Sequence, residues 1–277
     1  MADFLGDPNF PNKAMKSNRG VRIRYFQDLY KTYSRLHFSR ISDRPFAITG
    51  IESRLRRAYS TEGGWGIFDD GTGRGFLHRS LLWRRGHDES PDGMARFQMP
   101  TGRNGGRGEV PSWSWMGRSG GIDYLDPAFA QTQWMDIAGP WSSRDGVGAS
   151  SERSTHPEAN NTSPRSGINN TMELIAGVRE YDVRGRRKDE VDLVFDEEQR
   201  VQSDGAVRTR HWCLVVAKEY QGRNSKPTDA EMMHYILIVD PDEHGLEKTA
   251  GKVYRRIGAG KMLGKFIFAS EEKARIR

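Results

Sequence analysis

The chain contains the stretch Pro111-Ser112-Trp113-Ser114-Trp115-Met116, followed by Gly120-Gly121-Ile122-Asp123-Tyr124. Side chains of an extended strand alternate between two faces, so tryptophans two residues apart point the same way. Large aromatic side chains usually belong to protein cores. The spacing therefore predicts a strand that buries Trp113 and Trp115 on one face, bounded by Pro111 before it and by a glycine turn after it.

Composition limits the class of protein. The chain has 277 residues, enough for one large or two small domains. Hydrophobic residues make up 35%, a low share for a compact globule, which predicts that part of the chain lies outside any core. The single cysteine, Cys213, excludes an intrachain disulfide and favours a reducing compartment. The first residues do not resemble a signal peptide, and no apolar run is long enough for a membrane helix. We therefore expect a soluble, cytoplasmic protein without membrane contact.

Positive charge is concentrated near the N-terminus. The net charge of the whole chain is +6, but residues 16–57 hold eleven Lys and Arg against three Asp and Glu, a local net charge of +8. Such a bias attracts nucleic acid, although a solvated helix face has the same composition. The loop 101–108, rich in Gly and Arg, offers a second contact for RNA but lacks interleaved aromatic residues. A basic nucleic-acid-binding module therefore stays open as an alternative function.

The N-terminal part is predicted to be helical. Residues 1–20 are polar and interrupted by Gly and Pro, which predicts a disordered N-terminus. Helices are expected from Val21, after Asp43 as N-cap, and around residues 76–82. One apolar stripe of the first helix comprises Phe26, Leu29, Tyr33 and Leu36. Residues 21–125 thus form a predicted helical region that ends in the tryptophan strand.

The C-terminal part is predicted to be β-rich. Residues 142–168 contain almost no large apolar side chain, so residues 126–170 are expected to be a flexible linker or insertion. In residues 171–277, alternating or continuous apolar runs predict six short strands without intervening helices, around 172–178, 191–195, 212–217, 235–239, 253–258 and 266–268. This pattern is typical of an antiparallel barrel or sandwich. The predicted class is α+β, with an N-terminal helical segment followed by an antiparallel β-rich region.

No catalytic, cofactor-binding or metal-binding residue is predicted. Residues 258–262 match only the end of a phosphate-binding loop, and residues 240–245 lack two ligands of a calcium loop. The glycine run 71–75 follows two aspartates that would repel a phosphate. The seven histidines show no metal-ligand spacing, and Cys213 in mid-strand is expected to be an inert buried thiol. The sequence therefore favours a protein that is not an enzyme and has no cofactor.

Six segments together resemble one protein family. The Pro111–Trp115 stretch resembles the "PSWSW" signature of fungal heterokaryon-incompatibility (HET) domain proteins. The other segments resemble motifs that this family carries in the same order: Tyr33-Ser34-Arg35-Leu36, the helix from Asp43 to Ile51, Gly64-Trp65-Gly66-Ile67, Leu81-Leu82-Trp83 and, near the end, Tyr254-Arg255-Arg256-Ile257-Gly258. The resemblance covers about residues 25–268.

The resemblance implies a role in fungal non-self recognition and programmed cell death. In that family the HET domain, distantly related to TIR-type domains, precedes these motifs, and no residue here matches it. The chain is therefore expected to be the region C-terminal to a HET domain, as a truncated product or fragment. Its expected role is structural or interaction-bearing, with a protein partner such as a HET domain.

Overall fold

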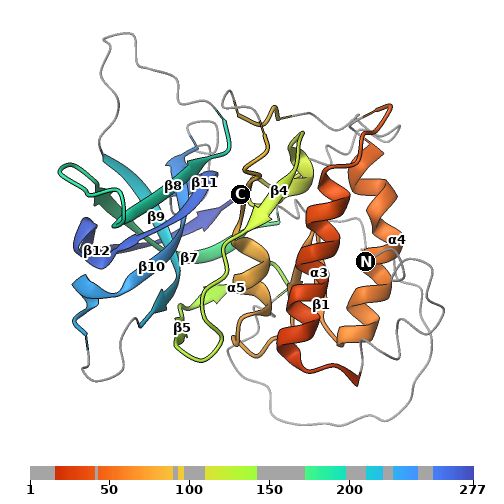
Figure 1. The fold of residues 1–277 in the computed structure, drawn as a ribbon, viewed down its shortest axis with the longest axis horizontal. Coiled ribbons are helices and arrows are strands. Elements are labelled where there is room, and N and C mark those ends of the chain that lie inside the picture. The colour runs from red at the N-terminus through yellow and green to blue at the C-terminus, as the bar shows by residue number, and fades with distance from the viewer. Residues whose placement is uncertain are drawn as a thin grey trace.

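The computed structural model describes residues 16–40, 43–89, 93–96, 110–141, 172–197, 210–220, 227–242 and 252–277. Within them, a helical part is followed by a mostly antiparallel sheet that lies beside it (Figure 1). This arrangement confirms the predicted α+β class and the order of its two parts. Of the expected disordered stretch 1–20, residues 1–15 lie outside the described residues, and the first described helix begins within it.

The described α-helices are α3 (Arg19–Ser34), α4 (Arg44–Tyr59) and α5 (Phe76–Leu81). Asn18 caps α3, because its side chain accepts a 3.0 Å hydrogen bond from Val21 N. Helix α4 begins directly after Asp43 as predicted, although the Asp43 side chain makes no capping hydrogen bond. The predicted stripe on α3 is buried except for Leu36, which is 52% exposed because it lies beyond the end of the helix.

A hairpin follows the two long helices. Strands β1 (Glu62–Gly64) and β2 (Ile67–Asp69) pair antiparallel and are joined by Trp65 and Gly66. Both turn residues have positive φ, 57° and 81°, which is the twist that a two-residue hairpin turn requires. A tryptophan in this conformation costs about 1–2 kcal/mol, so neighbouring contacts have to hold it there.

Aromatic side chains fill the space between α3, α4, α5 and this hairpin. The rings of Tyr30 and Phe68 stack 6.0 Å apart, and the Trp115 ring lies 5.2 Å from Tyr30. Offset and tilted ring pairs add about 0.5–1.5 kcal/mol each beyond the area that they bury. The rings that share this core include Phe26, Tyr30, Tyr59, Phe68, Phe76 and Trp115.

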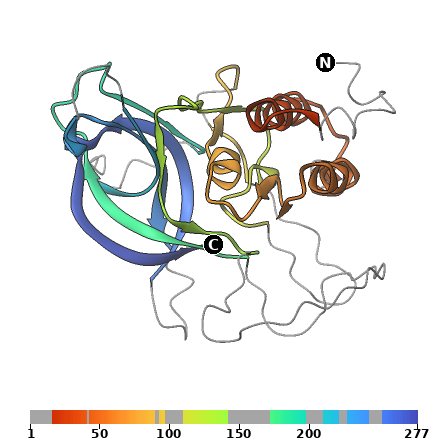
Figure 2. The same cartoon turned by 90° about the horizontal axis from the view of Figure 1, so that it is seen from below.

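All six predicted strands of the C-terminal part are present. They are β7 (Leu174–Asp182), β8 (Val191–Phe195), β9 (Arg210–Glu219), β10 (Met233–Pro241), β11 (Val253–Leu263) and β12 (Ile267–Ile276). The hydrogen-bonded order is β9-β10-β11-β12-β7, and β7 pairs back with β9, so the sheet closes on itself (Figure 2). Of the two predicted alternatives, the structure therefore has the barrel. Strands β11 and β12 are parallel over two residue pairs, and the other named pairings are antiparallel.

The stretch 126–170 was expected to be a linker, and for its first part that expectation is wrong. Strand β5 (Thr132–Trp134) pairs with β9, and β6 (Ile137–Ala138) pairs with β7. These strands are two and three residues long, too short for a periodic pattern, and they extend the sheet at its edges. Residues 142–171, which include the segment without apolar side chains, lie outside the described residues.

The predicted tryptophan strand is also wrong. Residues 112 and 113 form a turn, and Trp115–Gly117 is a 3-10 helix, η2. The Ser114 side chain caps this helix by accepting a hydrogen bond from Met116 N, which competes with an extended ladder. Both tryptophans are buried as predicted, with 0% exposure, but on different sides. Trp113 packs with the closed sheet, whereas Trp115 packs with the helices.

The remaining elements connect the two parts. The predicted third helix around residues 76–82 is α5, which ends at Leu81. Trp83 then begins strand β3 (Trp83–Arg85), which pairs with β4 (Ile122–Tyr124). Two further 3-10 helices are η3 (Asp229–Glu231) and η5 (Gly264–Phe266). Among the residues that the structure describes, no helix has the length and apolar character needed to cross a membrane.

Candidate functional site

The helical part and the closed sheet meet at a buried junction, which is built by the segments that carry the family resemblance. The Trp83 indole Nε1 donates a 2.8 Å hydrogen bond to the carbonyl of Trp113. Arg256 of β11 reaches across and donates to the carbonyls of Leu81 at 2.9 Å and Trp83 at 2.6 Å. Side chains therefore satisfy buried backbone carbonyls of segments that are distant in sequence.

The two serines of the Pro111–Trp115 stretch, Ser112 and Ser114, form hydrogen bonds with different parts of the protein. The Ser112 hydroxyl accepts a 2.9 Å hydrogen bond from Arg256 N and donates to the carbonyl of Arg277, which ties the stretch to β11 and to the end of β12. The Ser114 hydroxyl donates to the carbonyl of Trp65 at 2.7 Å, in the hairpin turn. Alternate residues of one short segment thus bind the sheet and the helical part.

Arg256 and Asp196 form an ion pair at the centre of the junction. Both side chains have 0% exposure, and their polar atoms approach at 3.2 and 3.3 Å. The guanidinium also lies 3.2 Å from the centroid of the Trp83 ring, a cation–π contact. Burial lowers the pKa of Arg256, and the Asp196 carboxylate opposes this shift. A pair so enclosed cannot meet a substrate, so its role is to anchor the junction.

Glu52 stabilises the strained hairpin turn. Its buried carboxylate accepts a 2.7 Å hydrogen bond from Gly66 N. Burial raises the pKa of Glu52, and the backbone hydrogen bond from Gly66 opposes the shift. A side chain at Gly66 would place its Cβ 2.3 Å from the Trp115 indole nitrogen, so glycine is required there. A buried carboxylate with a raised pKa suits acid–base catalysis in principle, but here it is fixed to the backbone within the helical core.

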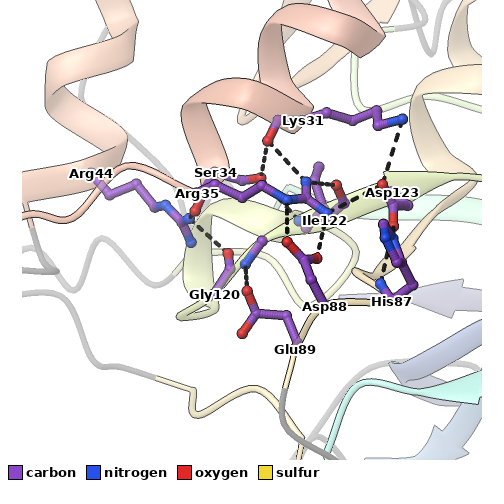
Figure 3. A network of polar contacts seen from close by, with 11 residues as sticks. Lys31, Ser34, Arg35, Arg44, His87, Asp88, Glu89, Gly120, Ile122 and Asp123 are labelled. Carbon is purple, nitrogen blue, oxygen red and sulfur yellow. Dashed lines mark hydrogen bonds and ion pairs between the residues drawn. The ribbon is translucent and has the colours of Figure 1, made fainter.

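A second polar network lies at the C-terminal end of α3, where that helix contacts β4 (Figure 3). Arg35 binds Asp88 with two hydrogen bonds, Nε to Oδ2 at 2.8 Å and Nη2 to Oδ1 at 2.6 Å. Its Nη1 donates to the Ile122 carbonyl at 2.6 Å, and Nη2 approaches Asp123 Oδ1 at 3.3 Å. The His87 ring nitrogen Nδ1 lies 2.9 Å from Asp123 Oδ2.

The network contains a possible metal-ligand set, but its charges oppose a cation. One ligand atom from each of His87, Asp88 and Asp123 could meet within 4.8 Å. However, both Asp88 oxygens are held by Arg35, and Lys31 lies 3.5 Å from Asp123. These two cations neutralise the carboxylates that a metal would need. The geometry therefore favours a charge clamp between α3, β4 and the loop at residues 86–89.

The clamp makes a pH-dependent contribution to stability. The hydrogen bonds from Arg35 lower the pKa of Asp88 to about 2, below the value of about 3.9 expected in the unfolded chain. The stabilisation is present above pH 4 and is lost as the pH falls from 4 towards 2. Between pH 4 and pH 2, the unfolding free energy of the Asp88→Asn variant should therefore fall less than that of the unaltered chain. At pH 7 the variant should be less stable than the unaltered chain by under about 1 kcal/mol, because the ion pair is partly exposed.

Urea unfolding at a series of pH values from 7 to 2 measures this effect. Asp189→Asn is the control, because Asp189 is exposed and its nearest cation contact, with Arg187, is 3.6 Å long. The control should follow the profile of the unaltered chain. Parallel profiles for Asp88→Asn and the unaltered chain would contradict the role of Arg35.

The structure also places the near-motifs noted in the sequence. Residues 258–262 lie within strand β11 rather than in a loop, and a Cβ at Gly260 would lie 2.3 Å from the Asp192 carbonyl of β8. The glycine run 71–75 is a loop, whose Thr72 hydroxyl and amide bind Asp70. The end of the calcium-like segment, from residue 243, and the Gly/Arg loop 101–108 lie outside the described residues.

Cys213 and the described histidines do not form a reactive group. Cys213 is buried in β9, and burial raises the pKa of its thiol to about 12, so the nucleophilic thiolate is not favoured. His78 and His234 are buried, and burial lowers the pKa of each. Their rings bind the backbone carbonyls of Met135 and Met232. His156 and His244 lie outside the described residues.

An open groove of about 390 Å³ lies on the closed sheet where β7, β9 and β12 meet. It is lined by Val178, Glu180, Trp212, Lys252, Phe268, Ser270 and Glu272. None of these residues was predicted as a site residue, because they come from β7, β9, β12 and the position before β11 and share no motif. The groove is open to solvent and brings charged and aromatic side chains together.

Comparison of the chain with protein-family models, curated proteins and solved structures returned no match. Its function therefore has to be argued from its own residues.

Proposed function

We propose that this chain is the region C-terminal to the HET domain of a fungal heterokaryon-incompatibility protein, and that it acts there as a non-catalytic interaction module. The observation that carries the proposal is the buried junction. Four segments that resemble family motifs, around Trp65, Trp83, Trp113 and Arg256, bind one another there through side-chain hydrogen bonds. Segments that depend on one another in this way are expected to occur as a set, in one order.

The proposal assigns these motifs to the scaffold rather than to a reaction. Their polar groups are buried and directed at backbone carbonyls of the same chain. A catalytic group must reach a substrate. The exposed surfaces, rather than the motifs, are therefore left to contact a partner.

We predict that the chain alone does not cleave NAD. The resemblance implies a TIR-related HET domain elsewhere in the protein, and TIR-type enzymes cleave NAD with a pocket that includes a glutamate. Glu52, the buried carboxylate with a raised pKa, is bound to Gly66 N. Incubation of the purified chain with NAD, followed by chromatography for nicotinamide, should give no product above buffer. Turnover that disappears in Glu52→Gln would contradict the proposal.

Binding of a HET domain tests the interaction role. The purified chain is titrated with a separately expressed fungal HET domain in a calorimeter, and saturable binding is expected. An unrelated α/β domain of similar charge is the control for nonspecific association. Absence of binding to HET domains would overturn this role.

Nucleic-acid binding is the second candidate function. The basic side chains of the helical part argue against it, because several are paired with acidic residues or buried. Among the eleven basic residues of 16–57, four form ion pairs with acidic residues of the same chain: Arg19, Lys31, Arg35 and Arg56. Arg44 is fully buried and donates to backbone carbonyls. The positive surface is therefore smaller than composition suggests.

A salt titration separates the two candidates. Binding of a labelled oligonucleotide that depended on several phosphate contacts would weaken steeply between about 50 and 200 mM salt. We expect weak binding at low salt and a shallow slope. Tight binding with a steep slope, weakened by Arg54→Ala and Arg57→Ala on the exposed face of α4, would favour the nucleic-acid module.

A further inference from the structure

The groove on the closed sheet owes its shape to an irregularity in β12. In the pairing with β7, residues 268–270 of β12 lie opposite the single residue Glu180. A bulge of this kind interrupts the ladder and redirects side chains. Phe268 and Ser270 both lie in the bulge and line the groove, and Phe268 is 43% exposed. Strand β12 then runs back to the helical part, where the chain ends (Figure 1).

The groove contains two carboxylates, of which Glu272 has hydrogen-bond partners and Glu180 has none within the described residues. Glu272 accepts hydrogen bonds from Lys252 Nζ, at 2.7 Å, and from the Tyr254 hydroxyl. Within the described part of the chain, Glu180 has no hydrogen-bond or ion-pair partner. The lining therefore carries one uncompensated negative charge, in a chain whose net charge is +6.

Aromatic rings lie beside this carboxylate. Trp212 of β9 is the direct cross-strand neighbour of Glu180, and both side chains line the groove. The Tyr254 ring lies 6.3 Å from the Trp212 ring, and Phe268 forms another wall. An unpaired carboxylate next to aromatic faces attracts a cation by ion pairing and by cation–π contact.

We propose that this groove binds a guanidinium group, carried by an arginine in a polypeptide or by a free arginine derivative. Glu180 supplies the counter-charge, and Trp212 supplies a face on which the planar group stacks. A volume of about 390 Å³ is in the range of sites that hold small ligands. The inference does not depend on the proposed function.

Other ligand classes fit the groove less well. An anion would meet the Glu180 charge, while the Lys252 ammonium is already bound to Glu272. A divalent metal would find one available carboxylate, since both Glu272 oxygens are occupied. A purely apolar ligand would leave Glu180 desolvated without a partner.

The test uses nuclear magnetic resonance of the seven tryptophan indole N–H groups in the full chain. The Trp212→Phe variant identifies the Trp212 signal by its loss. Titration with N-acetyl-arginine amide should shift that signal with millimolar affinity, whereas the neutral citrulline analogue should not. A pentapeptide with one central arginine among glycines distinguishes the sources, because tighter binding than the single residue indicates a ligand carried by a chain.

Variants make the assignment specific. Glu180→Gln should weaken binding at least about tenfold, because it removes a charge-assisted hydrogen bond. Glu271→Gln is the matched control, since Glu271 lies in the neighbouring strand β12 but pairs with Arg179 outside the groove. The affinity of this variant should equal that of the unaltered chain. Equal unfolding midpoints exclude misfolding as the cause. No shift at Trp212, equal binding of the citrulline analogue, or full binding by Glu180→Gln would overturn the proposal.

Discussion

Replacing Arg256 with alanine is expected to lower the free energy of unfolding by about 3–5 kcal/mol, because the substitution leaves Asp196 charged, buried and unpaired. Both residues have 0% exposure, and Arg256 also satisfies the carbonyls of Leu81 and Trp83. Urea unfolding followed by tryptophan fluorescence measures the loss.

Arg255→Ala is the matched control. Arg255 is adjacent in β11 but exposed, and a surface substitution of this kind is usually within about 0.5 kcal/mol of neutral. The double variant with Asp196→Ala and Arg256→Ala should be destabilised by less than the sum of the two single substitutions. Each single variant leaves one buried charge without its partner, and the double variant does not. A loss under about 1 kcal/mol for Arg256→Ala would contradict the anchoring role.

Truncation of either buried tryptophan to alanine is expected to cost about 3–5 kcal/mol. Trp113 packs edge-on to Trp141 at 6.3 Å and donates to the Met172 carbonyl at 3.2 Å. Trp115 contacts the Tyr30 ring at 5.2 Å and the Arg44 guanidinium at 5.3 Å. Each substitution opens a cavity in a different core.

Hydrogen exchange distinguishes the two cavities. Trp115→Ala should first raise amide exchange in α3 and α4, whereas Trp113→Ala should first raise it in β7. Phe46→Ala serves as the control, because Phe46 is 63% exposed and its truncation should leave the unfolding midpoint unchanged. Identical exchange patterns for the two tryptophan variants would show that they share one core after all.

The regular elements could be predicted because their apolar pattern reflects what they bury. Alternation in residues 172–178 and 191–195 and the continuous run at 235–239 match strands of the closed sheet. The choice between a barrel and a sandwich could not be made from the sequence, since pairing of β7 with β9 depends on which strand edges meet and not on the composition of either strand.

The stretch from Pro111 to Trp115 shows where local pattern is insufficient. Its spacing suits a strand, but its polar groups bind partners distant in sequence: Ser114 binds Trp65, 49 residues away, and Ser112 binds Arg277, 165 residues away. Those contacts select a turn and a 3-10 helix. The short edge strand Thr132–Trp134 was missed because three residues carry no periodicity.

The candidate sites were harder to predict than the fold. Composition alone predicts that arginines such as Arg44 and Arg256 are solvated, because arginine is rarely buried without partners. Most of their partners are backbone carbonyls, which leave no signal in the sequence, and Asp196 lies 60 residues from Arg256. Glu180 could not be predicted as a site residue, because the bulge opposite it depends on the pairing register of β7 and β12. The buried state of Cys213 was predicted correctly, since a continuous apolar run surrounds it.

The long reach of Arg256 has a consequence for synthesis on the ribosome. Its contact with the Trp83 carbonyl spans 173 residues. At about 5–20 residues per second, roughly 9–35 s pass between the emergence of Trp83 and that of Arg256. During this interval the helices are exposed without the strand that completes their inner surface, so the nascent chain is a candidate client for chaperones.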